Sequence, residues 1–436
     1  MVNDQELDLA DIQGNIIGGF NTDNIVLIGV TLPDAVEAAS VARWLGSLHL
    51  TTAAEVRRGR AQIKLALAEA TETWLGLGLG RRVLDLCVPK LQLLDNAFNI
   101  GMIGRAPGVL GDSTDPAGWK VGGTQPLDVL LIVASNNVTA VRSRARSLTE
   151  EAKAAGMLVT YSEAGQRLPR EREHFGFRDG ISQPDILGVD AGGTIAPGHF
   201  VFGYPQNPGG APFKPFQDPG GIADNGSLLV FRRLAQDVAA FRAFCSDKAK
   251  QLTKDWPMLS PDLLAAKIVG RWPSGAPLAA GAVADPDAIH PGNTFDFADD
   301  NGSVCPYGAH IRKVNPRLGP RDVVVIPRIL RRGIPFGPVY DSKPEAERGL
   351  LFLSYQTSIA DQFEFLTQHW MNSIVNPAKG QDLLVGRSSA GRTTYLELPS
   401  GELTVTDDGR QWITPTGGAY LFAPSRIGLS RIVAGA

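Results

Sequence analysis

Cysteine is scarce in this sequence, and its scarcity excludes several kinds of protein. Only Cys87, Cys245 and Cys305 occur among the 436 residues, and such an odd, widely spaced set argues against a disulfide framework. No Cys-x-x-Cys pair supports a structural zinc site, and no Cys-x-x-Cys-His motif is present to attach a c-type haem covalently. This cysteine content is typical of a reducing compartment.

Long apolar runs and an excess of one charge are also missing. No run reaches the length of about 18 apolar residues that a membrane span needs, so we expect none. Residues 1–8 are acidic and lack the basic and apolar regions of a signal peptide. The formal net charge of −3 gives no attraction for nucleic acid or anionic membranes. These features predict a cytoplasmic protein, although a leader removed by processing would leave no trace.

The sequence does contain enough apolar material for two packed domains, since 43% of its 436 residues are apolar. The first half alternates strands and helices in the order of a split βαβ unit. Its strands are expected at 24–32, 62–67, 127–134 and 157–161, and its helices at 34–49 and 138–155. The second half repeats the scheme with strands at 227–231, 322–326, 350–356 and 418–422, and helices at 235–252 and 358–372.

We therefore predict an α+β fold of two tandem ferredoxin-like domains with antiparallel sheets. The first domain spans residues 1–190 and the second spans 220–436, with a glycine- and proline-rich stretch at 184–225 between them.

Two segments contain side chains that suggest chemistry. Asp179 lies among the aromatic residues of His174 to Pro184, where a carboxylate is costly to bury unless it has a partner or a task. Far downstream, His310 lies in a basic segment, and an imidazole there could bind iron through one ring nitrogen. The alternatives are a structural turn capped by the aspartate and an exposed loop histidine. Arg331 and Arg332 follow an apolar run, and either arginine could enter a pocket or flank a turn.

Several stretches, taken in chain order, resemble the dye-decolorizing peroxidases, a family of b-type haem enzymes. The anchors are Asp-Ile-Gln-Gly-Asn-Ile at 11–16, the Gly-x-x-Asp-Gly motif at 176–180, the segments at 305–317 and 331–337, and Gly-Leu-Leu-Phe-Leu-Ser-Tyr-Gln at 349–356. Because the anchors run through most of the chain, the resemblance implies two ferredoxin-like domains with haem b held non-covalently, mainly by the C-terminal half.

The resemblance also implies roles on the two sides of the haem. His310 would be the proximal ligand of the iron, with Glu397 as the carboxylate that makes its ring more electron-donating. Asp179 and Arg331 would lie on the distal side, where the aspartate moves a proton between the peroxide oxygens and the arginine stabilises developing negative charge. An exposed strand glutamate is the alternative reading of Glu397.

Other residues are expected around the cofactor. Arg312 is the best candidate for pairing a haem propionate, with a surface ion pair as the alternative. The backbone of Ile181 and Ser182 would approach the haem edge. Leu351 and Leu353 share a strand face that forms either an apolar distal wall or plain core. Arg178 places a second cation beside Asp179 that could lower the pKa of the acid.

The resemblance implies a peroxidase that reduces hydrogen peroxide and oxidises dyes or phenolic donors by single electrons. Trp370, Tyr340 and Tyr355 are candidate surface residues for electron transfer to bulky donors, with buried packing as the alternative. A haem carrier without turnover is the competing function, and it would require His310 but no distal acid and arginine. The sequence leaves the physiological donor and the oligomeric state open.

Overall fold

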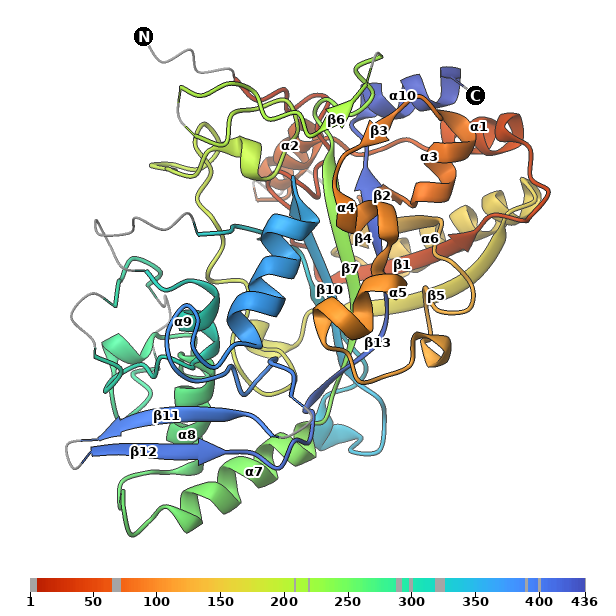
Figure 1. Cartoon of the computed structure of the whole chain (residues 1–436). Coiled ribbons are helices and arrows are strands. Elements are labelled where there is room, and N and C mark those ends of the chain that lie inside the picture. The colour runs from red at the N-terminus through yellow and green to blue at the C-terminus, as the bar shows by residue number, and fades with distance from the viewer. Residues whose placement is uncertain are drawn as a thin grey trace.

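Eight strands of the computed structural model close into one antiparallel sheet. The order β7-β13-β2-β4-β1-β5-β9-β10 returns to its start because β10 also pairs with β7, and β8 adds to β10. Figure 1 shows these strands at the centre of the molecule. The strands are β1 Asn24–Thr31, β2 Trp74–Leu79, β4 Val129–Ser135, β5 Leu158–Gln166, β7 Ser227–Gln236, β8 Leu330–Arg331, β9 Ile334–Phe336, β10 Gly349–Gln356 and β13 Ile413–Ala423. The predicted α+β class with antiparallel pairing is confirmed.

The structure describes residues 6–435 except 65–71, 208, 219, 288–291, 298–300, 318–325, 389–390 and 399–400. The α-helices within these ranges are α1 Ala38–Gly46, α2 Ala53–Lys64, α3 Arg81–Cys87, α4 Asn96–Ile100, α5 Met102–Arg105, α6 Val138–Ala154, α7 Val238–Gln251, α8 Pro261–Val269, α9 His310–Val314 and α10 Arg426–Gly435. Two short sheets pair β3 Gln92–Leu93 with β6 Phe216–Gln217, and β11 Thr393–Leu398 with β12 Gly401–Thr406. No helix in these described ranges is both long and apolar enough to cross a membrane.

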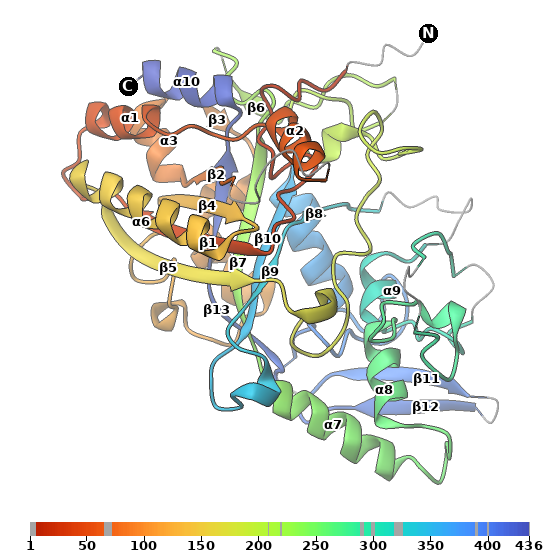
Figure 2. The same ribbon diagram turned by 180° about the vertical axis from the view of Figure 1, so that it is seen from behind.

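Both faces of the central strands are buried, which explains their continuous apolar sequences. In β4, Leu131 and Val133 pack into one core, while Leu130 and Ile132 pack into another. The first core is covered by α1, α3, α6 and α10, and Figure 2 shows α6 lying along β1, β4 and β5. The second core is enclosed by the sheet together with the N-terminal segment and residues 186–204.

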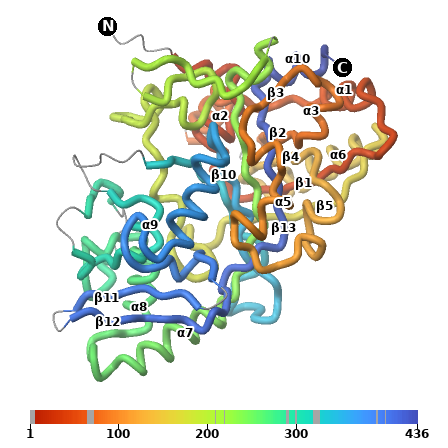
Figure 3. Tube along the Cα trace, viewed as in Figure 1, coloured from red at the N-terminus to blue at the C-terminus, as the bar shows by residue number. Residues whose placement is uncertain are grey.

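A third core lies outside the closed sheet and supports the cavity described below. It joins α7 and α8 with Phe175, Phe177 and residues of β11, β12 and the following segment. In Figure 3, α7, α8, α9 and the β11–β12 hairpin gather at one end of the molecule, away from α1, α3 and α10.

Several predicted elements differ from the structure. Residues 62–64 belong to the end of α2 rather than to a strand, and the strand in this region is β2, whose Gly76 and Gly78 weaken its β signal. The predicted helix 34–49 is shorter, at Ala38–Gly46, and α7 starts at Val238 because β7 continues to Gln236. The predicted strand 322–326 lies outside the described residues except Ile326.

The predicted helix 358–372 is present, but it winds as two π-helical stretches, η8 Ile359–Glu364 and η9 Leu366–Met371. Strands from residues 1–190 and from residues 220–436 share one sheet. The division of the chain into two domains at these residues remains a prediction.

A buried ion pair fixes the loop between η9 and β11. Arg392 and Asp407 have fully buried side chains, and the Asp407 carboxylate also accepts hydrogen bonds from the backbone N–H groups of Arg392 and Gly409. The guanidinium of Arg392 donates to the carbonyls of Gly386 and Arg410 as well. The pair therefore anchors the residues that precede and follow the hairpin.

Replacing Asp407 by alanine leaves the Arg392 guanidinium buried without its counter-charge. We expect the free energy of unfolding to fall by roughly 3–5 kcal/mol, measured by urea denaturation. The matched control is Asp408→Ala at an exposed neighbouring position, which should change stability by no more than about 0.5 kcal/mol. Equal stability of the two variants would contradict a structural role for the pair.

Candidate functional site

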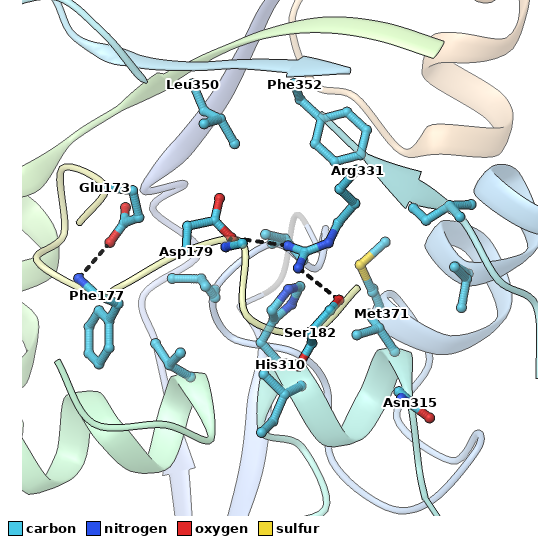
Figure 4. Close-up of a pocket in the computed structure, with 18 of the residues that line it drawn as sticks. Glu173, Phe177, Asp179, Ser182, His310, Asn315, Arg331, Leu350, Phe352 and Met371 are labelled. Carbon is cyan, nitrogen blue, oxygen red and sulfur yellow. Dashed lines mark hydrogen bonds and ion pairs between the residues drawn. The ribbon is translucent and has the colours of Figure 1, made fainter. Parts of the chain in front are cut away.

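A cavity of about 350 Å³ lies between the closed sheet and the third core. Its walls come from residues 173–184, the start of α9, strands β8 and β10, η8 and η9, and residues 384–387. Figure 4 shows the His310 ring pointing into it from α9, while Arg331 reaches in from the opposite side. The structure thus brings His310, Asp179 and Arg331, separated in sequence, to one cavity.

A buried carboxylate orients the His310 ring. His310 Nδ1 lies 2.7 Å from Oδ2 of Asp382, whose side chain is fully buried. The other oxygen, Oδ1, accepts the backbone N–H groups of Leu384 at 2.9 Å and Val385 at 3.1 Å. Because Asp382 is fixed in this way, it holds a proton on Nδ1 and leaves Nε2 as the ring nitrogen available to the cavity.

The acid beside His310 is a correction to the sequence interpretation. Glu397 lies on β11 and pairs with Lys379, which also binds Glu402 on β12, so its carboxylate is engaged within the hairpin region. Asp382 instead follows Gly380, whose φ is 88°, in the long loop after η9. An aspartate in a loop rich in glycine and proline was the only sequence signal for this contact.

Asp179 and Arg331 form an ion pair on the other side of the cavity. Arg331 Nη1 lies 3.2 Å from Asp179 Oδ1, and Arg331 Nη2 donates to the carbonyl of Ser182 at 3.2 Å. Oε1 of Gln183 accepts a hydrogen bond from the backbone N–H of Arg331, and Nε2 of Gln183 donates one to the backbone carbonyl of Arg331. These two hydrogen bonds connect β8 to the motif loop, which contains Asp179 and Ser182. The side chains of Asp179 and Arg331 keep 39% and 30% of their surface accessible, so both can contact a small ligand.

The two glycines of the motif permit the turn that presents Asp179. Gly176 and Gly180 have φ values of 101° and 81°, a region that other residues rarely adopt. Phe175 and Phe177 are buried in the third core and line the cavity, as the aromatic pattern suggested. The N–H of Gly180 donates to Oδ1 of Asp179 at 2.6 Å, which fixes the carboxylate.

Two arginines, the buried Arg271 and the half-buried Arg317, approach the motif loop without a carboxylate partner. Arg271 and Arg317 both donate to the Ser182 hydroxyl and to Oδ1 of Asn293. No described carboxylate forms an ion pair with either guanidinium, and Nε of Arg317 has no hydrogen-bond partner. Burial, together with the charges of Arg317 and Arg331, lowers the pKa of Arg271 to about 10. This crowding favours an anionic ligand.

Ile181 and Ser182 line the cavity as expected, but Arg312 does not. Arg312 is buried, donates to the carbonyl of Cys305 at 2.6 Å, and stacks on the ring of Tyr307 at 4.2 Å. Arg271 lies in no motif, and Arg317 ends the segment at 305–317 but no role was predicted for it, because only the fold brings both arginines beside Ser182.

The cavity wall formed by β10 also differs from the predicted one. Leu350 and Phe352 line the cavity, whereas Leu351 and Leu353 are fully buried in the second core. The plain core reading of Leu351 and Leu353 is therefore correct.

Neighbouring polar residues have structural partners. Arg178 pairs with Glu171 at 2.6 Å. Arg332 donates to the carbonyls of Asn15, Ile16 and Arg331, so it flanks the turn and does not enter the cavity. Nε2 of His174 lies 2.8 Å from the carbonyl oxygen of Phe336.

The suggested surface aromatics are mostly inside the protein. Tyr355 and Trp370 are buried, with 0% and 4% of their surface exposed, and Tyr340 is half-buried. Buried packing, the alternative considered for these residues, is correct for Tyr355 and Trp370.

Glu173 is a second carboxyl group at the cavity that sequence reasoning missed. It accepts the N–H groups of Phe175 and Phe177 at 2.9 and 3.0 Å, and Nε2 of Gln236 at 2.7 Å. Burial raises the pKa of Glu173 to about 7, and the charge of Asp179 adds to the rise. A carboxyl group six positions before Asp179 was present in the sequence, but nothing distinguished it from a surface acid.

Comparison with known proteins gives this site its class. Residues 265–402, which include His310, Arg331 and Asp382, match the family described as Dyp-type peroxidase, C-terminal. A dye-decolorizing peroxidase of Mycetinis scorodonius is 31% identical over 96% of this chain and 86% of its own length, and one from Exidia glandulosa is 30% identical over 96% and 85%.

Solved structures agree with these sequence relatives. An ancestral D-type dye-decolorizing peroxidase superposes with a TM-score of 0.86 and 28% identity, covering 98% of this chain and 99% of the other. The chain belongs to the dye-decolorizing peroxidase family. It is a haem peroxidase, and its cofactor is haem b.

The raised pKa of Glu173 predicts a pH-dependent stability. Because the folded pKa of about 7 exceeds the ordinary value of 4.5, the folded protein retains a proton that the unfolded chain loses between these values. Stability attributable to Glu173 therefore falls as pH rises through this window. Glu173→Gln should remove this pH-dependent contribution to stability. Between about pH 5 and about pH 8, the free energy of unfolding of the variant should therefore fall less than that of the wild type.

The measurement is urea unfolding of the haem-loaded proteins at both pH values. Glu150→Gln, at an exposed position on α6, is the control and should keep the wild-type difference. A Glu173→Gln variant with that same difference would show that the residue does not hold a raised pKa.

Proposed function

We propose that His310 would hold the haem iron and that Asp179 and Arg331, across the cavity, would act on peroxide. The observation that carries this proposal is the placement of the Asp179–Arg331 pair across the cavity from the His310 ring. Bound haem supplies the iron at which peroxide is reduced. A haem carrier would need the histidine but not the ionic pair, so this pair favours turnover.

The residues around the cavity fit a porphyrin with two carboxylates. The guanidiniums of Arg271 and Arg317 have no carboxylate partner among the described residues, and we propose that they, rather than Arg312, receive the propionates. Apolar side chains that include Leu350, Phe352 and Met371 line the rest of the cavity.

Asp179 would act as the proton carrier. Its ionised carboxylate accepts a proton from the inner oxygen of hydrogen peroxide and returns it to the outer oxygen, which then leaves as water. Arg331 holds Asp179 through Nη1 and presents positive charge where negative charge develops as the O–O bond breaks. Gln183, through its two hydrogen bonds to the Arg331 backbone, keeps the arginine in position.

Asp382 would act through His310. By holding the Nδ1 proton it increases the electron donation of Nε2, which stabilises the oxidised iron.

We further propose that the reducing substrates are aromatic and phenolic compounds. One dye-decolorizing peroxidase of known structure, with a TM-score of 0.81 and 26% identity, is described in complex with 2,6-dimethoxyphenol.

A cytoplasmic site of action is supported by three cysteines that are all free and buried.

Arg331→Leu tests the distal role. The variant should bind haem with an unchanged Soret band, because the arginine does not ligate iron. Its reaction with peroxide, followed by stopped-flow absorbance, should slow by about 10²–10³-fold, as expected when one preorganised charge is removed. Arg331→Lys, which keeps the charge, should retain more of the rate. An unchanged rate in Arg331→Leu would refute the assignment.

Asp382→Asn and Glu397→Gln decide which acid acts through His310. Asp382→Asn should raise the reduction potential of the iron and weaken haem retention by about 10–100-fold, since the hydrogen bond to Nδ1 loses its negative charge. Glu397→Gln is the matched control and should change neither quantity. Spectroelectrochemical titration and haem transfer to apomyoglobin give the two readouts. The reverse outcome would restore Glu397 to the proximal role.

A further inference from the structure

Behind the cavity wall lies a buried phenol with a buried carboxylate as its partner. Tyr420 on β13 is 4% exposed, and its hydroxyl donates to Oε1 of Glu364 at 2.9 Å. Glu364 ends η8, and its side chain is 2% exposed. Arg105 completes the cluster, since its guanidinium contacts both carboxylate oxygens, with Nε 3.0 Å from Oε1. None of the peroxide chemistry described above requires this cluster.

Aromatic rings connect Tyr420 to the cavity. The ring centroids of Tyr420 and Phe363 are 6.4 Å apart at an interplanar angle of 75°, and those of Phe363 and Phe352 are 6.0 Å apart. Phe352 and Phe363 both line the cavity, and Figure 4 shows Phe352 beside Arg331. Tyr420 therefore contacts the cavity wall through Phe363, and the two rings of Phe363 and Phe352 separate it from Arg331.

We propose that Tyr420 is a redox-active residue of this peroxidase, which gives one electron to the oxidant that peroxide generates in the cavity and passes its phenolic proton to Glu364. The proposal rests on the peroxide reaction proposed above. The O–H bond of Tyr420 breaks and an O–H bond forms at Oε1 of Glu364. Tyr420 is oxidised by one electron to a neutral phenoxyl radical, and the peroxide-derived oxidant is reduced by one electron. An electron from an organic donor reverses both transfers.

The surroundings of Tyr420 require electron and proton to move together. Burial raises the pKa of the phenol well above its ordinary value, and the charge of Glu364 adds to the rise, so the phenol does not ionise first. Loss of the electron alone would leave a cationic radical in a buried site, which is costly. Transfer of the proton over the 2.9 Å hydrogen bond avoids that charge.

Tyr420 combines a carboxylate that can accept its proton with a ring contact to the cavity wall. Tyr355, Tyr340 and Tyr161 have less suitable surroundings. The hydroxyl of Tyr355 accepts a hydrogen bond from Asn15 Nδ2, a group that does not receive a proton. The Tyr340 ring lies 5.1 Å from the Arg242 guanidinium and 5.0 Å from that of Arg348, and these positive charges oppose removal of an electron.

Tyr161 provides the closest comparison. Its hydroxyl donates to the Glu163 carboxylate at 2.5 Å, so it has a proton acceptor. Its ring contact is Phe231 at 6.2 Å, a residue of the second core that does not line the cavity. Tyr161 therefore shares the acceptor with Tyr420 but not the aromatic connection.

The test is electron paramagnetic resonance of the haem-loaded full chain, frozen within milliseconds of adding one equivalent of hydrogen peroxide without a donor. The wild type should show a neutral tyrosyl radical. Tyr420→Phe, which keeps the ring and removes the hydroxyl, should lose that signal, while the matched variant Tyr161→Phe should keep it at full intensity. Persistence of the signal in Tyr420→Phe, or its loss in Tyr161→Phe, would overturn the proposal.

Proton transfer to Glu364 is tested separately. Glu364→Gln offers an oxygen to the phenol but no base, so the radical should form about 10²-fold more slowly. A second measurement needs no variant: radical formation in the wild type should slow in D2O, because the proton moves with the electron. An equal rate in both solvents would contradict the coupled transfer.

Failure of the peroxidase assignment would be recognisable in the same samples. If peroxide left the Soret band of the wild type unchanged, the roles proposed for Asp179 and Arg331 would fail together with this one. If the Soret band changed but no tyrosyl radical depended on Tyr420, only the assignment of Tyr420 would be refuted.

Discussion

The site depends on the pairing of β10 with β7, which closes the sheet. Leu353 of β10 faces Phe231 of β7, and the same strand pairs Ser354 with Arg331 on β8. Because side chains alternate along a strand, this register sends Leu351 and Leu353 into the core and Leu350 and Phe352 towards the cavity. A slip of one residue would exchange these two sets and also move Arg331 relative to the motif loop.

Local hydrogen bonds hold the charged groups at the cavity edge. Asp382 is fixed by two backbone N–H groups, and Arg331 is fixed by Gln183 and the carbonyl of Ser182. Asp382 and Arg331 are therefore each held in part by neutral groups, and they in turn hold His310 and Asp179. Such preorganisation lets the charges act without the reorganisation that water would undergo.

The sequence predicted best the parts of the structure that depend on local pattern. Strands β1 and β4 were recognisable because both of their faces are buried, which gives continuous apolar runs. The turn that contains Asp179 was recognisable because its positive φ angles require glycine at positions 176 and 180. Contacts made by distant segments were less accessible. Asp382 meets His310 across 72 positions, and Arg271 meets Ser182 across 89, so neither pairing leaves a local signature. The face of β10 that lines the cavity depends on register, which a continuous apolar run leaves undetermined.

The π-helical winding of residues 359–371 connects the cavity to the protein interior. It brings Phe363, Leu366, Thr367 and Met371 to the cavity wall, while Glu364, between them, is buried against Tyr420 and Arg105. A helix of α-type places residues 100° apart, whereas the wider π turn changes which side chains share a face. The unusual winding thus lets one short segment supply both apolar wall and a buried base, so the aromatic wall of the cavity and the proton acceptor of Tyr420 have a single structural origin.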